Sequence, residues 1–199
     1  EYHGLWIVTG SNDPEKIRQA YKESYNRNSA LAGKDFLTYP YFYTTLFMWG
    51  VETFGYENFM VAAALDPEAY DQVLKGFLQR SKYHVQAMLD TGAPLLVLHD
   101  DLAISTGPAF NPDWYEKYLY PKYQELLKPI KEQKKRVLLT TDGNCTDLIP
   151  ALMDCGFDGF EIECPAADLK AILGDLNDKP ITAHACGPKP LVKSFYKAL

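Results

Sequence analysis

The chain has 199 residues, of which 47% are hydrophobic and 23% charged, and its formal net charge is −6. This acidic balance, without clusters of Lys and Arg, argues against nucleic acid and anionic membranes as partners, and no apolar run reaches the roughly 18–20 residues of a membrane-spanning helix. The composition is that of a globular protein, so we expect a single domain over residues 1–199.

The ends of the chain and its cysteines add two expectations. The first residues, Glu1-Tyr2-His3, do not have the character of a basic leader, so we expect a cytoplasmic protein. The chain lacks an initial Met and stops inside an expected helix, which indicates a processed or partial chain. No two of its cysteines form a CxxC pair, so we expect small buried side chains and not a redox or zinc-ribbon motif.

The first part of the chain is expected to mix short strands with helices. Asp13-Pro14 has the capping oxygen and the proline of a helix start, and Gly33 closes that helix. Short strands are expected over residues 4–8 and Phe36–Tyr39. The aromatic-rich stretch from Pro40 to Phe54 fits either the core or the wall of a pocket for a flat ligand.

The middle of the chain repeats this alternation. A long amphipathic helix is expected from Asp66-Pro67 to about Thr91, followed by a buried strand over Leu95–Leu98. A loop containing Gly107-Pro108 precedes the next helix, which begins at Asn111-Pro112. Two further prolines, Pro121 and Pro129, lie inside this helix, and we expect them to kink or break it because each removes a backbone hydrogen bond.

The clearest unit runs from Arg136 to Glu163. Arg136–Thr141 is expected as a buried strand, a polar turn follows, and a helix starts near Thr146 with Thr146 or Asn144 as its cap. Gly156 ends that helix, and Asp158–Glu163 is the next strand, parallel to the first through a right-handed crossover.

The spacing of the later strands indicates the fold class. Expected strands start near residues 136, 158 and 180, and this even spacing favours consecutive parallel βα units, with helices over 168–173 and from 190 onwards. A closed (β/α)8 barrel needs eight strands and about 250 residues, whereas we expect at most about six strands here. The chain is therefore either a large part of such a barrel or an open α/β sheet.

Polar residues gather where these strands end. Alternation puts Glu161 and Glu163 on one face of their strand, and Thr182, His184 and Cys186 on one face of the next. Carboxylate, imidazole and thiolate are all zinc ligands, so Glu163, His184 and Cys186 are the candidate metal site. In the alternative interpretation, Glu163 and His184 only hydrogen-bond to each other.

Two further acidic groups follow buried strands. Asp100 and Asp101 point to opposite faces of an extended segment, so one can act as a general base or anchor a cationic substrate while the other caps a turn. Asp142 and Asn144 form a polar turn after the central strand. We take Asp100, Asp101, Asp142 and Asn144 as candidate catalytic residues, against the alternative that they are solvated loop residues.

These motifs together resemble a known family. The order LLVLHDD (Leu95–Asp101), Gly107-Pro108, NPDW (Asn111–Trp114), Pro121 and the segment 136–163 resembles the uroporphyrinogen decarboxylase superfamily, especially its corrinoid-linked methyltransferase branches. The resemblance implies a (β/α)8 TIM-type barrel with its site at the carboxyl ends of the strands. Decarboxylase members act on a tetrapyrrole without a cofactor, whereas methyltransferase members use zinc and exchange a methyl group with a corrinoid protein.

The chain departs from the methyltransferase pattern at two positions. Several such enzymes carry His-x-Cys-Gly-Asn where this chain has Thr140-Thr141-Asp142-Gly143-Asn144, so Thr140 replaces the His and Asp142 the Cys. A metal would have to use Glu163, His184 or Cys186, or a ligand outside this chain. The arginine-rich segment that decarboxylases use for substrate carboxylates is not found in the sequence.

The sequence therefore supports three functional hypotheses. The first is a methyltransferase-like enzyme that moves a methyl group between a small donor and a corrinoid protein, with zinc as its metal. The second is a decarboxylase of a tetrapyrrole, and the third is a non-catalytic partner subunit. The expected partners are a small-molecule substrate, a corrinoid protein and, in a homodimer, a second copy of the chain.

Overall fold

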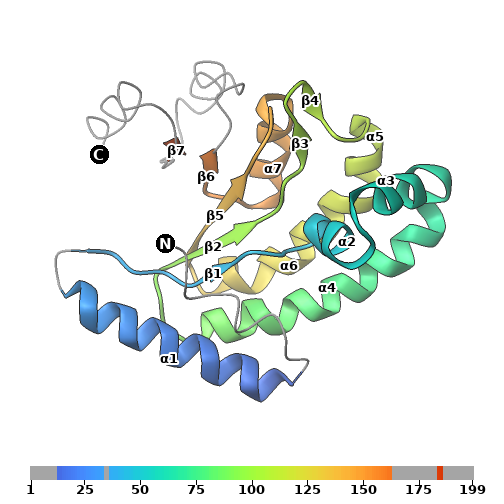
Figure 1. Cartoon of the computed structure of the whole chain (residues 1–199). Coiled ribbons are helices and arrows are strands. Elements are labelled where there is room, and N and C mark those ends of the chain that lie inside the picture. Colours follow the sequence, from blue (N-terminus) through green and yellow to red (C-terminus); the bar gives the residue numbers. More distant parts are fainter. Residues whose placement is uncertain (1–12, 34–35, 163–182, 186–199) are drawn as a thin grey trace.

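A five-stranded parallel sheet organises the protein. The computed structural model describes residues 13–33, 36–162 and the backbone of 183–185. The strands lie in the order β1 (Tyr41–Phe42), β2 (Leu95–His99), β5 (Arg136–Thr141), β6 (Gly159–Ile162) and β7 (Ala183–Ala185) (Figure 1). Sheet order follows chain order, so right-handed crossovers place the connecting helices on the same face of the sheet.

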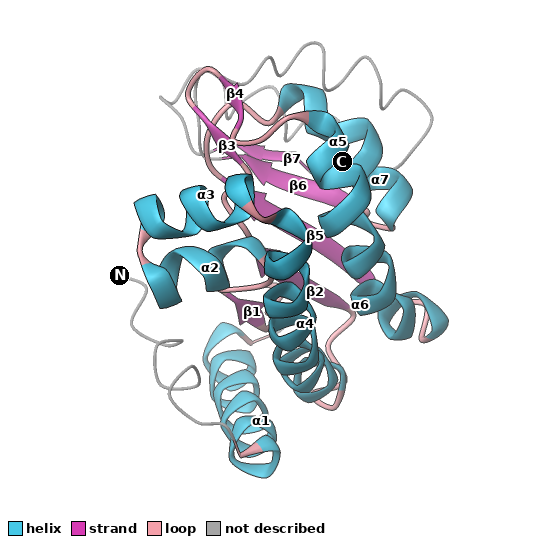
Figure 2. Ribbon diagram, turned by 90° about the vertical axis from the view of Figure 1, so that its right-hand side faces the viewer, coloured by secondary structure: helices cyan, strands magenta, loops and turns pink. Residues whose placement is uncertain are grey.

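That face is covered by a layer of helices, in which α1 packs on α4, α4 on α6 and α6 on α7 (Figure 2). The helical elements are α1 (Pro14–Ala32), α2 (Phe47–Phe54), α3 (Tyr56–Leu65), α4 (Pro67–Leu89), α5 (Pro112–Trp114), the π-helical η1 (Tyr115–Leu119), α6 (Tyr120–Glu132), the 3-10 helix η2 (Thr146–Leu148) and α7 (Ile149–Cys155). Alternate strand residues join the hydrophobic core beneath them, namely Leu96, Leu98, Val137, Leu139, Phe160 and Ile162.

The expected fold class is confirmed in its general form. Parallel strands in sequential order, with helices on one face, are how a (β/α)8 barrel is wound. A closed barrel needs eight strands, and the five strands of the described sheet do not close. The described part of the chain is therefore an α/β fold with a parallel sheet, and the complete barrel stays a prediction.

The expected helix starts are confirmed at the level of single hydrogen bonds. Asp13 accepts a hydrogen bond from the backbone N–H of Glu15, and Asp66 accepts one from Ala69, each at 3.0 Å. Asn111 accepts one from Trp114, also at 3.0 Å. In each case the side-chain oxygen satisfies a donor that the first helical turn leaves without an intrahelical partner.

The strand expected over Phe36–Tyr39 is wrong. The first strand among the described residues begins later, at Tyr41, and the pairing with β2 starts at the carbonyl of Pro40, which accepts a hydrogen bond from Val97 at 3.1 Å. Phe36 is 74% exposed, so its side chain contributes no core packing that would hold this segment against the sheet. Aromatic content alone therefore misplaced the strand.

The aromatic stretch that follows contributes side chains both to the core and to the opposite face of the sheet. Phe42 and Phe47 are buried in the core, and Phe42 stacks on His84 of α4 with ring centroids 4.2 Å apart. Tyr41 and Tyr43, on alternate residues, take the opposite face of the sheet and are half-buried. The core and the wall of a possible site are thus made from alternate residues of one segment.

Pro121 breaks the long helix between β2 and β5 as expected, whereas Pro129 lies inside α6, which continues past it to Glu132 without a break. The break takes the form of a π-helical segment, in which the N–H of Tyr120 donates to the carbonyl of Tyr115, directly before Pro121. The preceding loop also differs from the expectation, because it folds into a short antiparallel hairpin of β3 (Ala103–Ile104) and β4 (Gly107–Pro108).

Two helical glycines give a test of core packing. A Cβ at Gly50 of α2 would overlap the Tyr70 hydroxyl and lie 2.6 Å from Cδ2 of Phe59, whereas a Cβ at Gly76 of α4 would meet nothing within 4 Å. Gly50→Ala should lower the free energy of unfolding by about 1–3 kcal/mol because it overpacks the core. Gly76→Ala should raise it by about 0.5–1 kcal/mol through helix propensity. Urea unfolding measures both, and equal effects of the two substitutions would contradict the packing.

Candidate active site at the carboxyl edge of the sheet

One row of polar side chains crosses the sheet face that is turned away from the helices. The side chains of the row come from His99 of β2, Thr140 of β5 and Glu161 of β6, which are paired in this order, and His184 of β7 joins the row only by the backbone pairing with Glu161. Residues in register on neighbouring parallel strands lie about 4.8 Å apart and share a face. The hydroxyl of Thr140 donates to Glu161 Oε2 at 2.7 Å, so two members of the row are in direct contact.

Asp101 links the ends of two neighbouring strands. Its Oδ1 accepts a hydrogen bond from His99 Nε2 at 2.9 Å and another from the backbone N–H of Asp142, also at 2.9 Å. Burial raises the pKa of Asp101, but the hydrogen bond and positive charge of His99 outweigh it and hold the pKa below its ordinary value. Its side chain is 30% exposed, so an ionised carboxylate reaches solvent at this edge.

Aromatic rings surround the imidazole of His99. The Tyr43 ring lies 4.5 Å from it between centroids, in an edge-on arrangement, and the Tyr41 ring lies 6.1 Å away. His99 itself is only 4% exposed. The carboxylate of Asp101 and the two rings therefore fix the orientation of the imidazole on the sheet face.

A tight turn positions Asp142 beside Asp101. Gly143 has φ 77°, and a Cβ there would overlap the carbonyl of Ala103 on the β3–β4 hairpin, so only glycine fits. The next residue, Asn144, donates its backbone N–H to Ile104 at 2.8 Å. Asp142 is exposed, and its Oδ1 accepts from the N–H of Gly143 at 2.7 Å. The β3–β4 hairpin and the turn at Asp142–Asn144 therefore stabilise each other through these contacts.

Asp100 lies on the opposite side of the strand from Asp101, as alternation predicts. Its carboxylate is fully buried and accepts hydrogen bonds from the backbone N–H groups of Leu46, at 2.7 Å, and Met48, at 2.8 Å. The hydroxyl of Tyr123 donates a third, at 2.5 Å. Burial raises the pKa of Asp100 to about 6, while the three hydrogen bonds lower it. These contacts favour a structural role, holding the start of α2 against β2 and α6.

Of the other predicted site residues, Asn144 and the backbone of His184 lie within the described part of the chain. Asn144 Oδ1 accepts from the hydroxyl of Thr146 at 2.7 Å and from its N–H at 3.3 Å, so the Asn144 side chain holds the first residue of η2, while Cys145 occupies the N-cap position. His184 takes its place in the row through its backbone pairing with Glu161. Glu163 and Cys186 lie outside the described residues, so the predicted metal set stays a prediction.

Three residues of this edge were not among the predicted site residues. In the sequence, His99 was part of the motif Leu95–Asp101, Glu161 was placed only on a strand face, and Tyr43 belonged only to an aromatic stretch. Strand alternation could find the face on which each lies. It could not find the row, because the register between strands depends on tertiary packing.

The described residues by themselves contain no metal site. Within residues 13–33 and 36–162, no group of three or more His, Cys, Asp or Glu side chains is close enough to hold a metal ion. Cys145 and Cys155 are buried, as the sequence led us to expect. In the same part of the chain, no helix combines the length and the apolar character needed to cross a bilayer.

Comparison with known families identifies the chain. The profile of the family described as uroporphyrinogen decarboxylase (URO-D) matches residues 17–190. The chain belongs to the uroporphyrinogen decarboxylase family. The match covers every strand of the described sheet, so the polar row lies inside the family domain. Comparison with curated protein sequences finds no significant match.

A solved structure has the same fold. A methyltransferase from Methanosarcina mazei superposes with a TM-score of 0.62 at 19% sequence identity. The matched region covers 78% of this chain and 46% of that protein, so the chain spans less than half the length of the methyltransferase. At this level of identity the likeness concerns the fold alone.

The buried carboxyl of Asp100 gives a pH test. Its pKa is about 6 in the folded chain against 3.8 as the ordinary value, so its stabilising contribution is complete below about pH 4 and is lost as pH rises through 6. The free energy of unfolding of the wild type minus that of Asp100→Asn should therefore fall by roughly 3 kcal/mol at most across this window. Denaturant unfolding at several pH values measures the difference. Asp154→Asn, at an exposed carboxylate, is the control, and a difference that rises with pH would contradict the assignment.

Proposed function

We propose that this chain is part of a methyl-transferring enzyme of the uroporphyrinogen decarboxylase family, which moves a methyl group between a small donor and a corrinoid protein. The observation that carries the proposal is the chemistry of the sheet edge. It presents carboxylates and an imidazole, in Asp101, Asp142, Glu161 and His99, on the face where the family has its site.

Within the described residues, cations are missing from the segments that follow three of the strands, and this argues against the decarboxylase alternative. These segments follow β1, β2 and β5 and lie within residues 36–74, 99–116 and 137–162, which contain no Lys or Arg. A porphyrinogen carries several carboxylates. Binding them in a cleft without cations would be unfavourable in free energy, because each desolvated charge would lack a partner. A neutral or cationic methyl donor meets no such penalty at this edge.

The donor set of the chain is compatible with zinc. Thr140 and Asp142 replace the His and Cys of the methyltransferase motif, so Glu163, His184 and Cys186 are the proposed ligands. The pairing of His184 with Glu161 supports this choice, because it puts an imidazole-bearing residue and a carboxylate-bearing residue in one row on neighbouring strands. Zinc bound there would supply a Lewis acid for the leaving group or for an acceptor thiol.

The described residues have a separate task in this proposal, which is to bind and orient the donor. Asp101 fixes the imidazole of His99 and the backbone of Asp142, so both strand ends keep their spacing. Asp142 is exposed at the rim and is the group best placed to contact the donor. Asp101 is then a positioning residue, and Asp100 acts at greater distance through the packing of α2.

The proposal is tested with the protein that carries this chain, methylcobalamin and 2-mercaptoethanol. We expect about one zinc per chain and thiol-dependent consumption of methylcobalamin, with S-methylmercaptoethanol as product. His184→Ala and Glu163→Gln should each remove most of the zinc and the activity, while Asp154→Asn, at an exposed carboxylate of α7, should change neither.

The alternatives predict different results in the same experiments. Loss of carboxylate groups from uroporphyrinogen under anaerobic conditions, without bound zinc, would replace the proposal with the decarboxylase. Protein that holds no zinc and accelerates neither reaction would support the non-catalytic subunit instead.

A further inference from the structure

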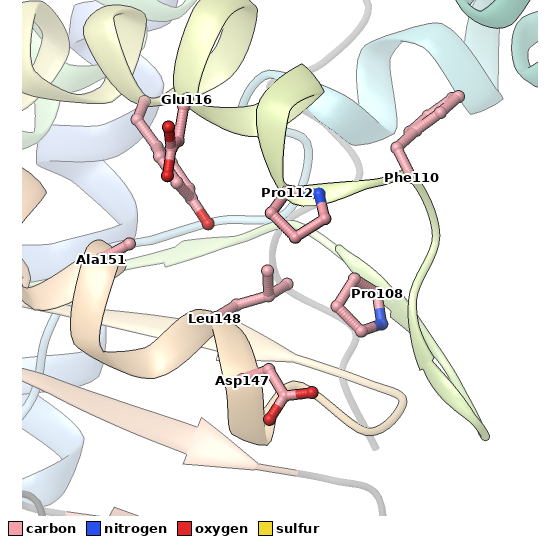
Figure 3. Close-up of a pocket in the computed structure, with 8 residues that line it drawn as sticks. Pro108, Phe110, Pro112, Glu116, Asp147, Leu148 and Ala151 are labelled. Atoms are coloured by element: carbon pink, nitrogen blue, oxygen red, sulfur yellow. The ribbon is translucent and has the colours of Figure 1, made fainter.

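A pocket of about 320 Å³ lies away from the polar row, between the β3–β4 hairpin, η1 and the start of α7 (Figure 3). Pro108, Pro112 and Leu148 point toward one another across it, and Ala151 lies at one end (Figure 3). None of the residues in the polar row lines this pocket. Its volume is at the lower end of the range for sites that bind small organic molecules.

Two carboxylates border this apolar pocket. Glu116 and Asp147 lie on opposite sides of Leu148 (Figure 3), and within the described part of the chain neither side chain takes part in a hydrogen bond or an ion pair. No Lys or Arg lines the pocket. The neighbouring cation, Lys117, pairs instead with Glu68 at 2.9 Å. The pocket therefore combines an apolar floor with uncompensated negative charge.

This combination defines the class of ligand. A metal ion would need several oxygen ligands gathered at one point, and among the described residues no such cluster exists. A neutral apolar molecule would use only the apolar lining and gain nothing from the two exposed carboxylates, and an anion would be repelled by them. We propose that the pocket binds a small organic ammonium ion, with its apolar or aromatic body on Pro108, Pro112 and Leu148 and its charged end towards Glu116 and Asp147.

A ligand here would also reach the candidate active site through the backbone. Pro108 belongs to the β3–β4 hairpin, and Asp147 and Leu148 belong to η2, directly after the turn that carries Asp142. Hairpin and turn are already joined by the hydrogen bond from Asn144 to Ile104. An occupied pocket would bridge the same two segments and hold the turn more firmly, so the ligand acts as an effector of the site.

Calorimetric titration with 2-phenylethylammonium, and with 2-phenylethanol as the uncharged analogue of similar shape, tests the proposal. The ammonium should bind at millimolar concentration and raise the melting temperature, and the alcohol should bind at least about tenfold more weakly. The double variant Glu116→Gln, Asp147→Asn should weaken ammonium binding by at least about tenfold. Asp113→Asn, at an exposed acid of α5 that does not line this pocket, should leave it unchanged.

A third variant tests the location. Ala151→Phe puts a ring into the pocket and should abolish binding of the ammonium, while the other acids of the surface stay in place. No heat of binding with wild-type protein, or equal affinity for the alcohol, would overturn the ligand class. Undiminished binding by Ala151→Phe, or equal loss in the double variant and in Asp113→Asn, would overturn the site.

Discussion

The buried carboxylate of Asp100 joins three parts of the chain that lie far apart in sequence. It follows β2, accepts backbone hydrogen bonds from the start of α2 and receives the hydroxyl of Tyr123 from α6. A buried carboxylate is tolerated only when its oxygens are hydrogen-bonded, so this residue determines where α2 begins and how closely α6 approaches the sheet. Asp101, the next residue, is thereby directed to the other face, where the polar row lies.

Because neighbouring residues of an extended segment point to opposite faces, Asp100 supports the packing of the helices while Asp101 lies on the face with the polar row. Asp100 belongs to the side packed against helices, and Asp101 holds His99 and the backbone of Asp142 on the side that carries Thr140 and Glu161. The interior of a closed barrel is filled mostly by branched apolar side chains. A row of polar side chains in that position is unusual, and polar side chains are what a binding or catalytic site needs. The polar row is therefore the candidate site, and it lies within the residues that match the family.

The electrostatics of the carboxyl edge limit the range of ligands. The segments that follow β1, β2 and β5 carry acids and aromatic rings without Lys or Arg, and the separate pocket beside the hairpin repeats that pattern with Glu116 and Asp147. Both features favour neutral or cationic small molecules over polyanions. The hairpin β3–β4 lies between them, and its hydrogen bond to Asn144 connects the pocket with the turn that positions Asp142.

The sequence by itself determined the local structure: the helix starts at Asp13, Asp66 and Asn111, the break near Pro121 and the parallel βα units, because capping oxygens, prolines and strand periodicity act over a few residues. It also determined that Asp100 and Asp101 lie on opposite faces, but not which of them faces the polar row. Only the tertiary structure decided that the first described strand begins at Tyr41 and that His99, Thr140, Glu161 and His184 are in register on neighbouring strands. Strand position and register depend on which side chains far apart in the chain pack together, and no local pattern encodes that.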